Sequence, residues 1–488
     1  MTVYKRFTIL VTSMDTPTTK YQFVNRTKEL EHLEKLYKET EKEGQFFVLY
    51  GKRRVGKTEL IKHFYQNKPH FYYLASRIAA KDQLKTFSAV LADYLNEPFL
   101  KNSPFANWRD LFDFLGKKMQ QNTTPQILVF DEFPYLVEGD EGMSSYFQYG
   151  WDECLKNTKT FLILSGSSIG MMYKHAIAYS APLYGRRTSQ LFLEAFTFQD
   201  AKKFYNDTDF EKAFSFYAIA GGIPGYLKQF DPKQTLWENI QEKILPKGTL
   251  MNSDPELIIS EELNEPQQYL TILKAIGSGR TKFAEIISAS NLAPNVVTKY
   301  LGVLMQLRWV RREVPVTEDP DNSKKGSYVL ADSYFRFYYS FIFPNQSALE
   351  SMQAELFLKK IKEGFPYFVS KIYEDTTTEF IQTAMREKKL PTFYQLGRWW
   401  DKNTEIDLVG LNKDDDAILF VETKWNSKPI GTDILADLKK KSQQVQWGSK
   451  ERKEYFALVA KGGFTEELIQ RARQEKVLLI EKDTVKND

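Results

Sequence analysis

Residues 51–58 constrain the fold of this chain more than any other feature. Their sequence, GKRRVGKT, satisfies the pattern G-x-x-x-x-G-K-[ST]. The apolar run FFVLY at 46–50 comes directly before them, and the helix-forming stretch ELIKHFY follows. A strand, a glycine-containing loop and a helix in this order direct backbone N–H groups and a helix N-terminus at an anion. The segment therefore predicts a polyphosphate-binding loop in an α/β fold.

Several residues of this loop have expected roles. Lys57 would reach the β- and γ-phosphates, and the Thr58 hydroxyl would be a ligand of Mg²⁺. The alternative is a chance match to the pattern, which the strand–loop–helix context disfavours. The residues expected to bind the nucleotide are Gly51, Arg54, Val55, Gly56, Lys57 and Thr58.

A second acidic segment complements this loop. In ILVFDEF at 127–133, a buried apolar strand ends in Asp131, which would hold Mg²⁺ directly or through water. Glu132 beside it is placed to polarise an attacking water as a general base. Acidic residues often end strands, so this interpretation depends on the loop upstream.

Length and composition limit the class of protein. The 488 residues suffice for three or four domains, and 67 basic against 63 acidic residues give a charge of +4. One cysteine, Cys154, excludes an internal disulfide and a cysteine-based zinc cluster, and four histidines offer little for a metal. No apolar run approaches the ~20 residues of a membrane-spanning helix. We expect a cytoplasmic protein without a membrane partner.

Apolar runs alternate with helical stretches and indicate the layout of the chain. The runs at 71–74, 127–130 and 161–164 read, like 46–50, as parallel strands buried on both faces. From about 200 to 260 the pattern is mainly helical. The expected units are an N-terminal tail at 1–20, a P-loop core at 21–200, a helical lid at 201–262, a winged helix at 263–345 and a C-terminal α/β domain at 346–488.

Six segments carry a resemblance to a known family: FVNRTKEL, GKRRVGKT, LVFDEF, LSGSS at 164–168, LYGRRTSQLFL at 183–193 and GGIPGYL at 221–227. Together, over about 21–260, they resemble the archaeal-type ATPases, a branch of the AAA+/STAND P-loop NTPases. The resemblance implies a five-stranded parallel sheet, a helical lid touching the nucleotide, and ATP. It implies that Ser167 senses the γ-phosphate. Arg186 would be an arginine finger or a cis phosphate ligand, with Arg187 the weaker choice and a plain surface arginine the alternative; a finger acting in trans would require a homo-oligomer.

Residues 265–277, 281–288 and 293–307 predict three short helices, and the strands after them would form a two-stranded wing. Such a winged helix-turn-helix would bind DNA or serve as a protein-contact or spacer module. Asn295 and Thr298 lie near the start of the third helix. The cations expected to be exposed and able to contact phosphates are Lys282, Lys299, Arg308, Arg311, Arg312, Lys324 and Lys325.

The C-terminal strands carry a second group of charged residues. EIDLVG at 405–410 and AILFVETK at 417–424 would pair as a hairpin. If Asn412 faces Ala417, Asp407 lies opposite Glu422 on the face that also carries Lys424. Two facing carboxylates can bind Mg²⁺ and activate water, while the lysine offers a cation to a phosphodiester transition state. Glu374 in the preceding helix could complete the metal set.

RWWDKNTEIDLVG followed by FVETKW resembles the PD-(D/E)XK restriction-endonuclease-like fold, in the version attached to archaeal-type ATPases as a domain of unknown function. The resemblance covers roughly 350–488. It carries Glu374 over from YEDTTTEFI, where Glu379 competes, and Ile406 replaces the usual proline of the first motif. The sequence thus predicts an ATPase that controls a nuclease-like, nucleic-acid-directed module. The alternative is a nucleotide-gated DNA- or protein-binding regulator with an inert C-terminal domain.

Overall fold

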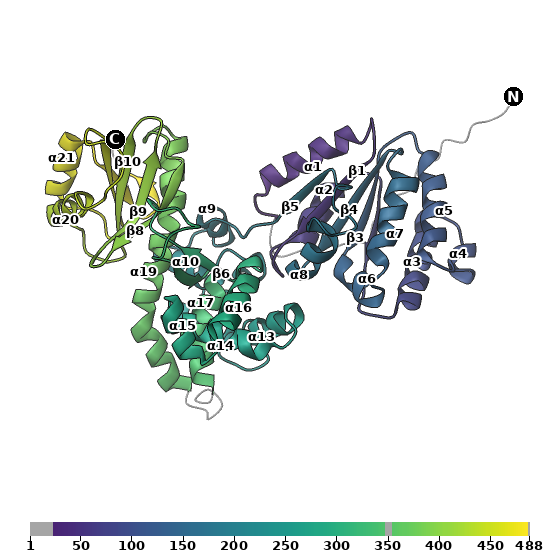
Figure 1. Cartoon of the computed structure of the whole chain (residues 1–488), viewed down its shortest axis with the longest axis horizontal. Helices are drawn as coiled ribbons and strands as arrows, with labels where there is room; N and C mark the ends of the chain where they lie inside the picture. The colour runs from purple at the N-terminus through teal and green to yellow at the C-terminus, as the bar shows by residue number, and fades with distance from the viewer. Residues whose placement is uncertain (1–22, 347–353, 487–488) are drawn as a thin grey trace.

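The computed structural model describes residues 23–346 and 354–486, and these form two lobes (Figure 1). Residues 23–192, the core lobe, hold the P-loop and a parallel sheet. Residues 198–486, the second lobe, hold the helices of the expected lid, a three-helix module with a small sheet, and a C-terminal sheet domain. The predicted tail at 1–20 lies outside the described residues. Within the described ranges, no helix is long and apolar enough to cross a membrane.

The core lobe contains a five-stranded sheet in the order β2-β3-β4-β1-β5, and all its pairings are parallel. The strands expected from the apolar runs are confirmed, and so is the parallel five-stranded sheet. Their bounds are β1 (Gln45–Tyr50), β2 (His70–Leu74), β3 (Gln126–Asp131), β4 (Thr160–Gly166) and β5 (Ser189–Phe192).

Helices cover both faces of this sheet (Figure 1). Alternate strand residues point to opposite faces, so Phe47 and Ile163 pack on one side while Val48 and Leu164 pack on the other. Helices α1 (Thr27–Glu39) and α2 (Lys57–Tyr65) cover the first side. The second is covered by α3 (Ala80–Leu95), α4 (Phe99–Asn102), α5 (Trp108–Gln120), α6 (Phe133–Gly139), α7 (Met143–Tyr149), η1 (Gly150–Leu155), α8 (Ile169–Met172) and η2 (Tyr173–Ile177).

The second lobe begins with short helices and continues into the three-helix module. Its first helices are α9 (Phe198–Ala201), η3 (Lys202–Phe204), α10 (Phe210–Ala220), α11 (Pro224–Leu227), α12 (Leu236–Lys243) and α13 (Leu250–Glu262). The three helices and the antiparallel strand pair expected after residue 265 are present. They are α14 (Pro266–Gly277), α15 (Phe283–Ser290), α16 (Pro294–Gln306), β6 (Val310–Glu313) and β7 (Ser327–Leu330), followed by α17 (Ser333–Phe337), η4 (Tyr338–Ile342) and η5 (Phe343–Asn345).

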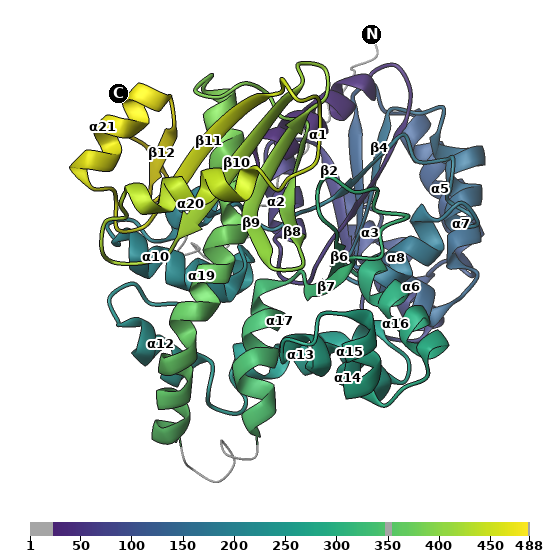
Figure 2. The ribbon, with the colours of Figure 1, turned by 60° about the vertical axis from the view of Figure 1, so that its left-hand side comes forward.

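The C-terminal domain is a six-stranded mixed sheet in the order β13-β12-β11-β10-β9-β8. The predicted hairpin register is confirmed, because Ala417 pairs with Asn412. Helix α19 lies behind this sheet and α20 in front of it in Figure 2. The elements are α19 (Ala354–Arg386), β8 (Gln395–Asp401), β9 (Thr404–Asn412), β10 (Ala417–Lys424), α20 (Thr432–Ser442), β11 (Lys453–Ala460), α21 (Glu466–Glu475), β12 (Leu478–Glu481) and β13 (Thr484–Val485).

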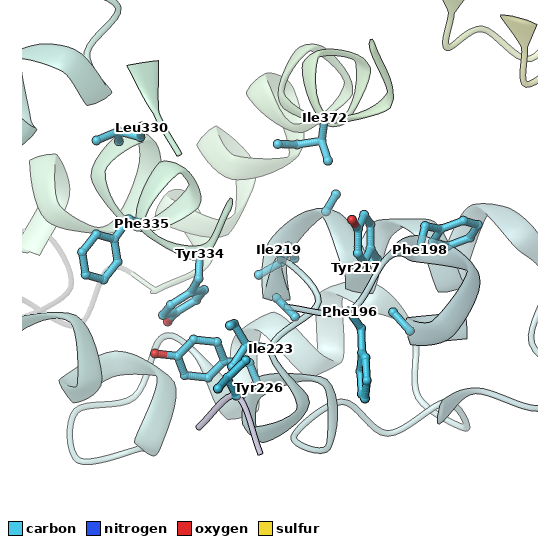
Figure 3. Packing of buried hydrophobic residues seen from close by; sticks show 14 of the residues in the cluster. Phe196, Phe198, Tyr217, Ile219, Ile223, Tyr226, Leu330, Tyr334, Phe335 and Ile372 are labelled. Carbon is cyan, nitrogen blue, oxygen red and sulfur yellow. The ribbon is translucent and has the colours of Figure 1, made fainter. Parts of the chain in front are cut away.

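The parts of the second lobe share one buried core. Figure 3 shows Tyr217 and Ile219 of α10 beside Tyr334 of α17 and Ile372 of α19. At the edge of the C-terminal sheet, the ring of Phe214 in α10 lies 5.2 Å from that of Tyr373 and 5.0 Å from that of Trp425. Aromatic contacts of this kind bury much apolar area. The C-terminal domain is therefore packed firmly onto the α10 region, not tethered by a bare linker.

Candidate functional site

The P-loop connects the end of β1 to the start of α2. Gly56 precedes the helix with φ 99°, a left-handed conformation that glycine adopts without a steric cost. Val55 is buried, and its carbonyl accepts a 3.1 Å hydrogen bond from the Arg26 guanidinium. Arg54 also has a positive φ, and its carbonyl accepts from the Gly225 amide at 3.2 Å. The GGIPG segment therefore packs directly on the loop.

Lys57 lies inside the loop with 5% of its surface exposed. Its Nζ donates to the carbonyl oxygens of Gly51 at 2.9 Å and Lys52 at 3.0 Å. Burial lowers the pKa of Lys57 to about 8, although Glu132 and Asp131 act in the opposite direction. An ammonium in this position would gain from a bound anion, which would compensate for its lost hydration.

Thr58 and Asp131 meet at the carboxyl end of β3. The Thr58 Oγ1 donates to Oδ2 of the fully buried Asp131 at 2.7 Å. The Tyr72 hydroxyl, from β2, donates to the same oxygen at 2.8 Å. Hydroxyl and carboxylate oxygens are the ligands that Mg²⁺ prefers, so this pair fits the expected metal. Sequence reasoning missed Tyr72, because nothing in the FYYL run distinguishes it from its neighbours.

Glu132 and Ser167 also lie together. The Glu132 Oε2 accepts from the Ser167 amide at 3.1 Å and from its Oγ at 2.8 Å. Glu132 has φ 54° and precedes α6, which turns its side chain toward the end of β4. The two residues expected to act on the attacking water and the γ-phosphate are therefore in direct contact.

Arg186 lies elsewhere. Its Nε donates to Asp152 Oδ2 at 2.8 Å and its Nη1 to the Pro182 carbonyl at 3.0 Å. The described residues that line the cavity beside the P-loop do not include Arg186. The weaker choice, Arg187, donates to the carbonyls of Ala176 and Ile177. Within one chain, the structure does not bring either arginine to the P-loop cavity.

The second lobe lines one side of that cavity. Glu262, the last residue of α13, accepts from the amides of Ile169 at 2.8 Å and Gly170 at 3.1 Å. Burial raises the pKa of Glu262, while these hydrogen bonds lower it. Sequence reasoning gave this residue no role. From the core lobe the cavity is lined by Lys52, Arg53, Glu132 and Ser167, and from the second lobe by Glu261, Glu262, Trp309 and Asp332 among others.

Several cations of the three-helix module form pairs within the chain; Arg308 and Lys325 are exposed as expected, whereas Arg311 and Arg312 are partly buried. Arg308 pairs with Glu194, which lies in the segment that follows β5. Arg311 pairs with Glu313 at 2.6 Å and with Asp375 of α19 at 3.1 Å, so it faces the C-terminal domain. Arg312 donates to backbone carbonyls of its own loop, and Lys325 pairs with Glu318 at 2.8 Å. The polar residues of the module that are exposed include Asn295, Thr298, Lys299 and Lys324.

At the C-terminal hairpin, the carboxylates Asp407 and Glu422 lie on neighbouring strands. Asp407 accepts from the Thr423 amide at 2.8 Å. Glu422 is bound by two lysines, Lys424 at 2.6 Å and Lys441 of α20 at 3.1 Å. Burial, with the nearby charges of Glu422 and then Glu374, raises the pKa of Asp407 to about 7.

The two acidic candidates of α19 face different parts of the molecule. Glu374 pairs with Lys371 at 2.7 Å and lies 3.8 Å from Arg398 of β8. Glu379 accepts from the Phe198 amide at 2.9 Å and from the Tyr217 hydroxyl at 3.2 Å, both outside the C-terminal domain. Of the two, Glu374 contributes to the raised pKa of Asp407.

In this structure the C-terminal carboxylates are not arranged as a set of metal ligands. Across the described ranges, no group of three or more His, Cys, Asp or Glu side chains is arranged to hold a metal ion. Lysine ammonium groups occupy the oxygens of Glu422 that a cation would need. A metal ion there would lie close to these ammonium groups, whose charge repels it.

Comparisons with known proteins agree with this architecture. Residues 23–230 match the family described as an ATPase domain predominantly from Archaea, and residues 338–443 match one described as archaea bacterial proteins of unknown function. An uncharacterised protein of Methanocaldococcus jannaschii is 34% identical over 443 residues, which cover 90% of this chain and 95% of that protein.

Two further similarities are local or distant. An uncharacterised ATP-binding protein of Methanocaldococcus jannaschii is 56% identical over 46 residues, 9% of this chain and 75% of its own length. The structure of a Walker-type ATPase of Pyrococcus abyssi aligns with 65% of this chain and 96% of its own, at 21% identity and a TM-score of 0.48. By its sequence identity to a relative of nearly the same extent and by its two matched regions, the chain belongs to the archaeal-type P-loop ATPase family with a C-terminal domain of unknown function.

Proposed function

We propose that this chain binds and hydrolyses ATP with Mg²⁺, and that its nucleotide state controls a C-terminal nuclease-like module directed at nucleic acid. One observation carries the first part of the proposal: Thr58 and Asp131 share a 2.7 Å hydrogen bond beside the buried ammonium of Lys57. This is the donor set that a metal–triphosphate complex needs.

The roles follow from what each side chain contacts. Loop amides and the N-terminus of α2 would surround the β- and γ-phosphates, and Lys57 would exchange its carbonyl partners for phosphate oxygens. Bound Mg²⁺, held by Thr58 and Asp131, would neutralise phosphate charge. Glu132 would accept a proton from the attacking water once it releases Ser167, whose hydroxyl would then turn to the γ-phosphate.

Arg186 can serve only after it leaves Asp152. In this proposal it acts in trans, as a finger reaching the nucleotide of a neighbouring copy in a homo-oligomer. Its position on the segment before β5, apart from the cavity of its own chain, favours this arrangement over a cis ligand.

The packing of the second lobe supports control of the C-terminal domain. The GGIPG segment and α13 border the P-loop, while α10 and α19 share a buried core with the C-terminal sheet. A shift of the lid region on nucleotide binding would therefore carry the C-terminal domain with it.

The test of the enzymatic part is phosphate release from Mg²⁺-ATP by the full chain. Glu132→Gln should retain nucleotide binding and lose turnover, because the amide cannot accept the proton. Tight binding with negligible turnover in the unaltered chain, with or without nucleic acid, would contradict hydrolysis and favour the regulator described next.

A second candidate function is a nucleotide-gated regulator with an inert C-terminal domain. Glu422 held by two lysines favours it, as do the module cations that pair within the chain. Incubation of the full chain with linear, supercoiled and single-stranded DNA and with RNA, with Mg²⁺ or Mn²⁺ and ATP, separates the two. Cleavage that disappears in Asp407→Ala and Lys424→Ala supports the nuclease; intact substrates in every condition support the regulator.

Contact with DNA has its own test. Lys299 and Lys324 are exposed cations of the three-helix module, and a salt-dependent shift of duplex DNA should weaken in Lys299→Glu. An exposed lysine of the core lobe, Lys117, gives the matched control as Lys117→Glu. Binding that is absent at low salt, or equal in both variants, would remove DNA from the proposal.

A further inference from the structure

The three basic residues that follow the first glycine of the P-loop are all tied to the second lobe. The Lys52 ammonium pairs with Asp332 at 2.7 Å. Arg53 pairs with Glu261, and Arg54 binds Asp254 through two hydrogen bonds of 2.7 and 2.9 Å. The expected ligand of this loop is a polyphosphate, yet the three cations of the loop pair with carboxylates from distant parts of the chain.

These ion pairs differ in burial and in position. Lys52 and Arg53 line the cavity beside Glu132 and Ser167, whereas Arg54 does not line it. The Asp254 side chain is 1% exposed and also accepts from the Tyr226 hydroxyl at 2.6 Å. A buried carboxylate with three donors is costly to expose. We therefore expect the ion pair of Arg54 and Asp254 to remain intact when nucleotide binds. The ion pairs of Lys52 and Arg53 instead border the cavity where phosphates would lie.

We propose that Asp332 and Glu261 are positioning residues of the nucleotide site, which hold Lys52 and Arg53 on the second lobe until a triphosphate competes for them. The inference rests on the proposed ATP binding. A triphosphate carries several negative charges close to this loop, so Lys52 and Arg53 exchange carboxylate for phosphate when it binds. Arg54 and Asp254 stay paired and act as the pivot about which the second lobe moves once the other two ion pairs have broken.

The released carboxylate lies on a helix that reaches the C-terminal domain. Asp332 caps α17, where its Oδ1 accepts from the Phe335 amide at 3.0 Å. One turn further, Arg336 pairs with Asp375 of α19 at 3.0 Å, next to Glu374. Helix α17 therefore connects the P-loop at one end to α19 at the other. Loss of the ion pair between Lys52 and Asp332 would shift α17 and, through Arg336, the part of α19 that carries Glu374.

Hydrogen–deuterium exchange and calorimetry of the full chain, with Mg²⁺ and a non-hydrolysable ATP analogue, test this inference. The analogue should slow exchange of the amides at 52–58 and speed it at 333–340. Asp332→Asn keeps the helix cap, since asparagine caps as well as aspartate, but removes the charge. It should show faster exchange at 333–340 without nucleotide and bind the analogue about fivefold more tightly, the worth of one ion pair.

Matched variants separate this effect from general destabilisation. Glu261→Gln should also tighten binding, whereas Asp254→Asn, at the pivot, should destabilise the chain without tightening it. Glu34→Gln, which removes an ion pair with Lys68 inside the core lobe, should leave affinity unchanged. Protection at 52–58 with unaltered exchange at 333–340, and unchanged affinity in Asp332→Asn and Glu261→Gln, would overturn the inference alone. No protection at 52–58 would overturn the proposed function and this inference with it.

Discussion

The P-loop and the C-terminal hairpin both bring lysines close to carboxylates, but the lysines contact different partners. Lys57 donates to backbone carbonyls, and Asp131 receives only neutral hydroxyls from Thr58 and Tyr72 among its side-chain contacts. Glu422 at the hairpin carries two ammonium groups. Buried charges are stable only when compensated. In the proposed function the first site therefore accepts both an anion and a cation from solution, whereas Glu422 in the second site already has two lysine counter-ions.

The largest effect is expected from a substitution in the P-loop. Lys57→Ala removes the ammonium that would neutralise transferring phosphate, and we expect phosphate release to fall by a factor on the order of 10²–10³. Lys117→Ala, an exposed position on α5, is the control and should keep full turnover. Hydrolysis retained in Lys57→Ala would show that the P-loop is not where ATP is processed.

The next effect concerns α19, where Glu374 pairs with Lys371, whereas Glu379 accepts hydrogen bonds from the Phe198 amide and the Tyr217 hydroxyl. Burial raises the pKa of Glu379 to about 7, although its hydrogen bonds from Phe198 and Tyr217 oppose this. A carboxyl whose folded pKa is raised favours the fold below its unfolded pKa, near 4.5, and this contribution is lost as the pH rises through 7.

Glu379→Gln should therefore remove a pH-dependent part of the unfolding free energy on the order of 2 kcal/mol. Urea unfolding midpoints measured at pH 5 and pH 8 should differ less in the variant than in the unaltered chain. Equal pH dependence in the two proteins would mean that Glu379 is ionised in the fold throughout this range.

The third prediction removes one of the two lysine counter-ions of the C-terminal hairpin, so that its carboxylates become more available to a metal ion. Lys441→Ala leaves Glu422 with one cation, so Mn²⁺ should raise the unfolding temperature of this variant by about 2–4 °C more than that of the unaltered chain. Adding Asp407→Asn should abolish the extra shift. An identical metal response in all three proteins would mean that the lysines are not what keeps metal from the hairpin.

The smallest effect concerns Tyr72. Tyr72→Phe removes one of the two hydroxyl donors to Asp131, and we expect the Mg²⁺ concentration needed for half-maximal ATP hydrolysis to change about fivefold, the worth of one typical hydrogen bond of about 1 kcal/mol. Tyr73→Phe, one position along on the opposite face of β2, is the matched control. Equal Mg²⁺ requirements in both variants would remove Tyr72 from the site.

Much of the fold was predictable because its signals are local. The P-loop, the strand ending in Asp131 and the register that pairs Ala417 with Asn412 all follow from spacing within short segments. Strand β8 gave no such signal, because a bulge between Gly397 and Trp399 interrupts the two-residue alternation. Strand β12 was also missed, since four apolar-rich residues after α21 do not separate a strand from a helix end.

The contacts between the lobes were not predictable. Lys52 pairs with Asp332 across 280 residues of the chain and Arg54 with Asp254 across 200. Charge patterns along the sequence do not identify such partners. Arg311 was expected to be exposed and able to contact DNA phosphates, but it pairs with Asp375 of α19. Tertiary packing decides which surface charges stay free.

Calorimetric titration of the folded full chain with Mg²⁺-ATP is the most direct test of nucleotide binding at the P-loop. We expect saturable heat for one site per chain, and its loss in Lys57→Ala while that variant remains folded. No heat of binding from the unaltered, folded chain, or an unchanged isotherm in Lys57→Ala, would contradict it.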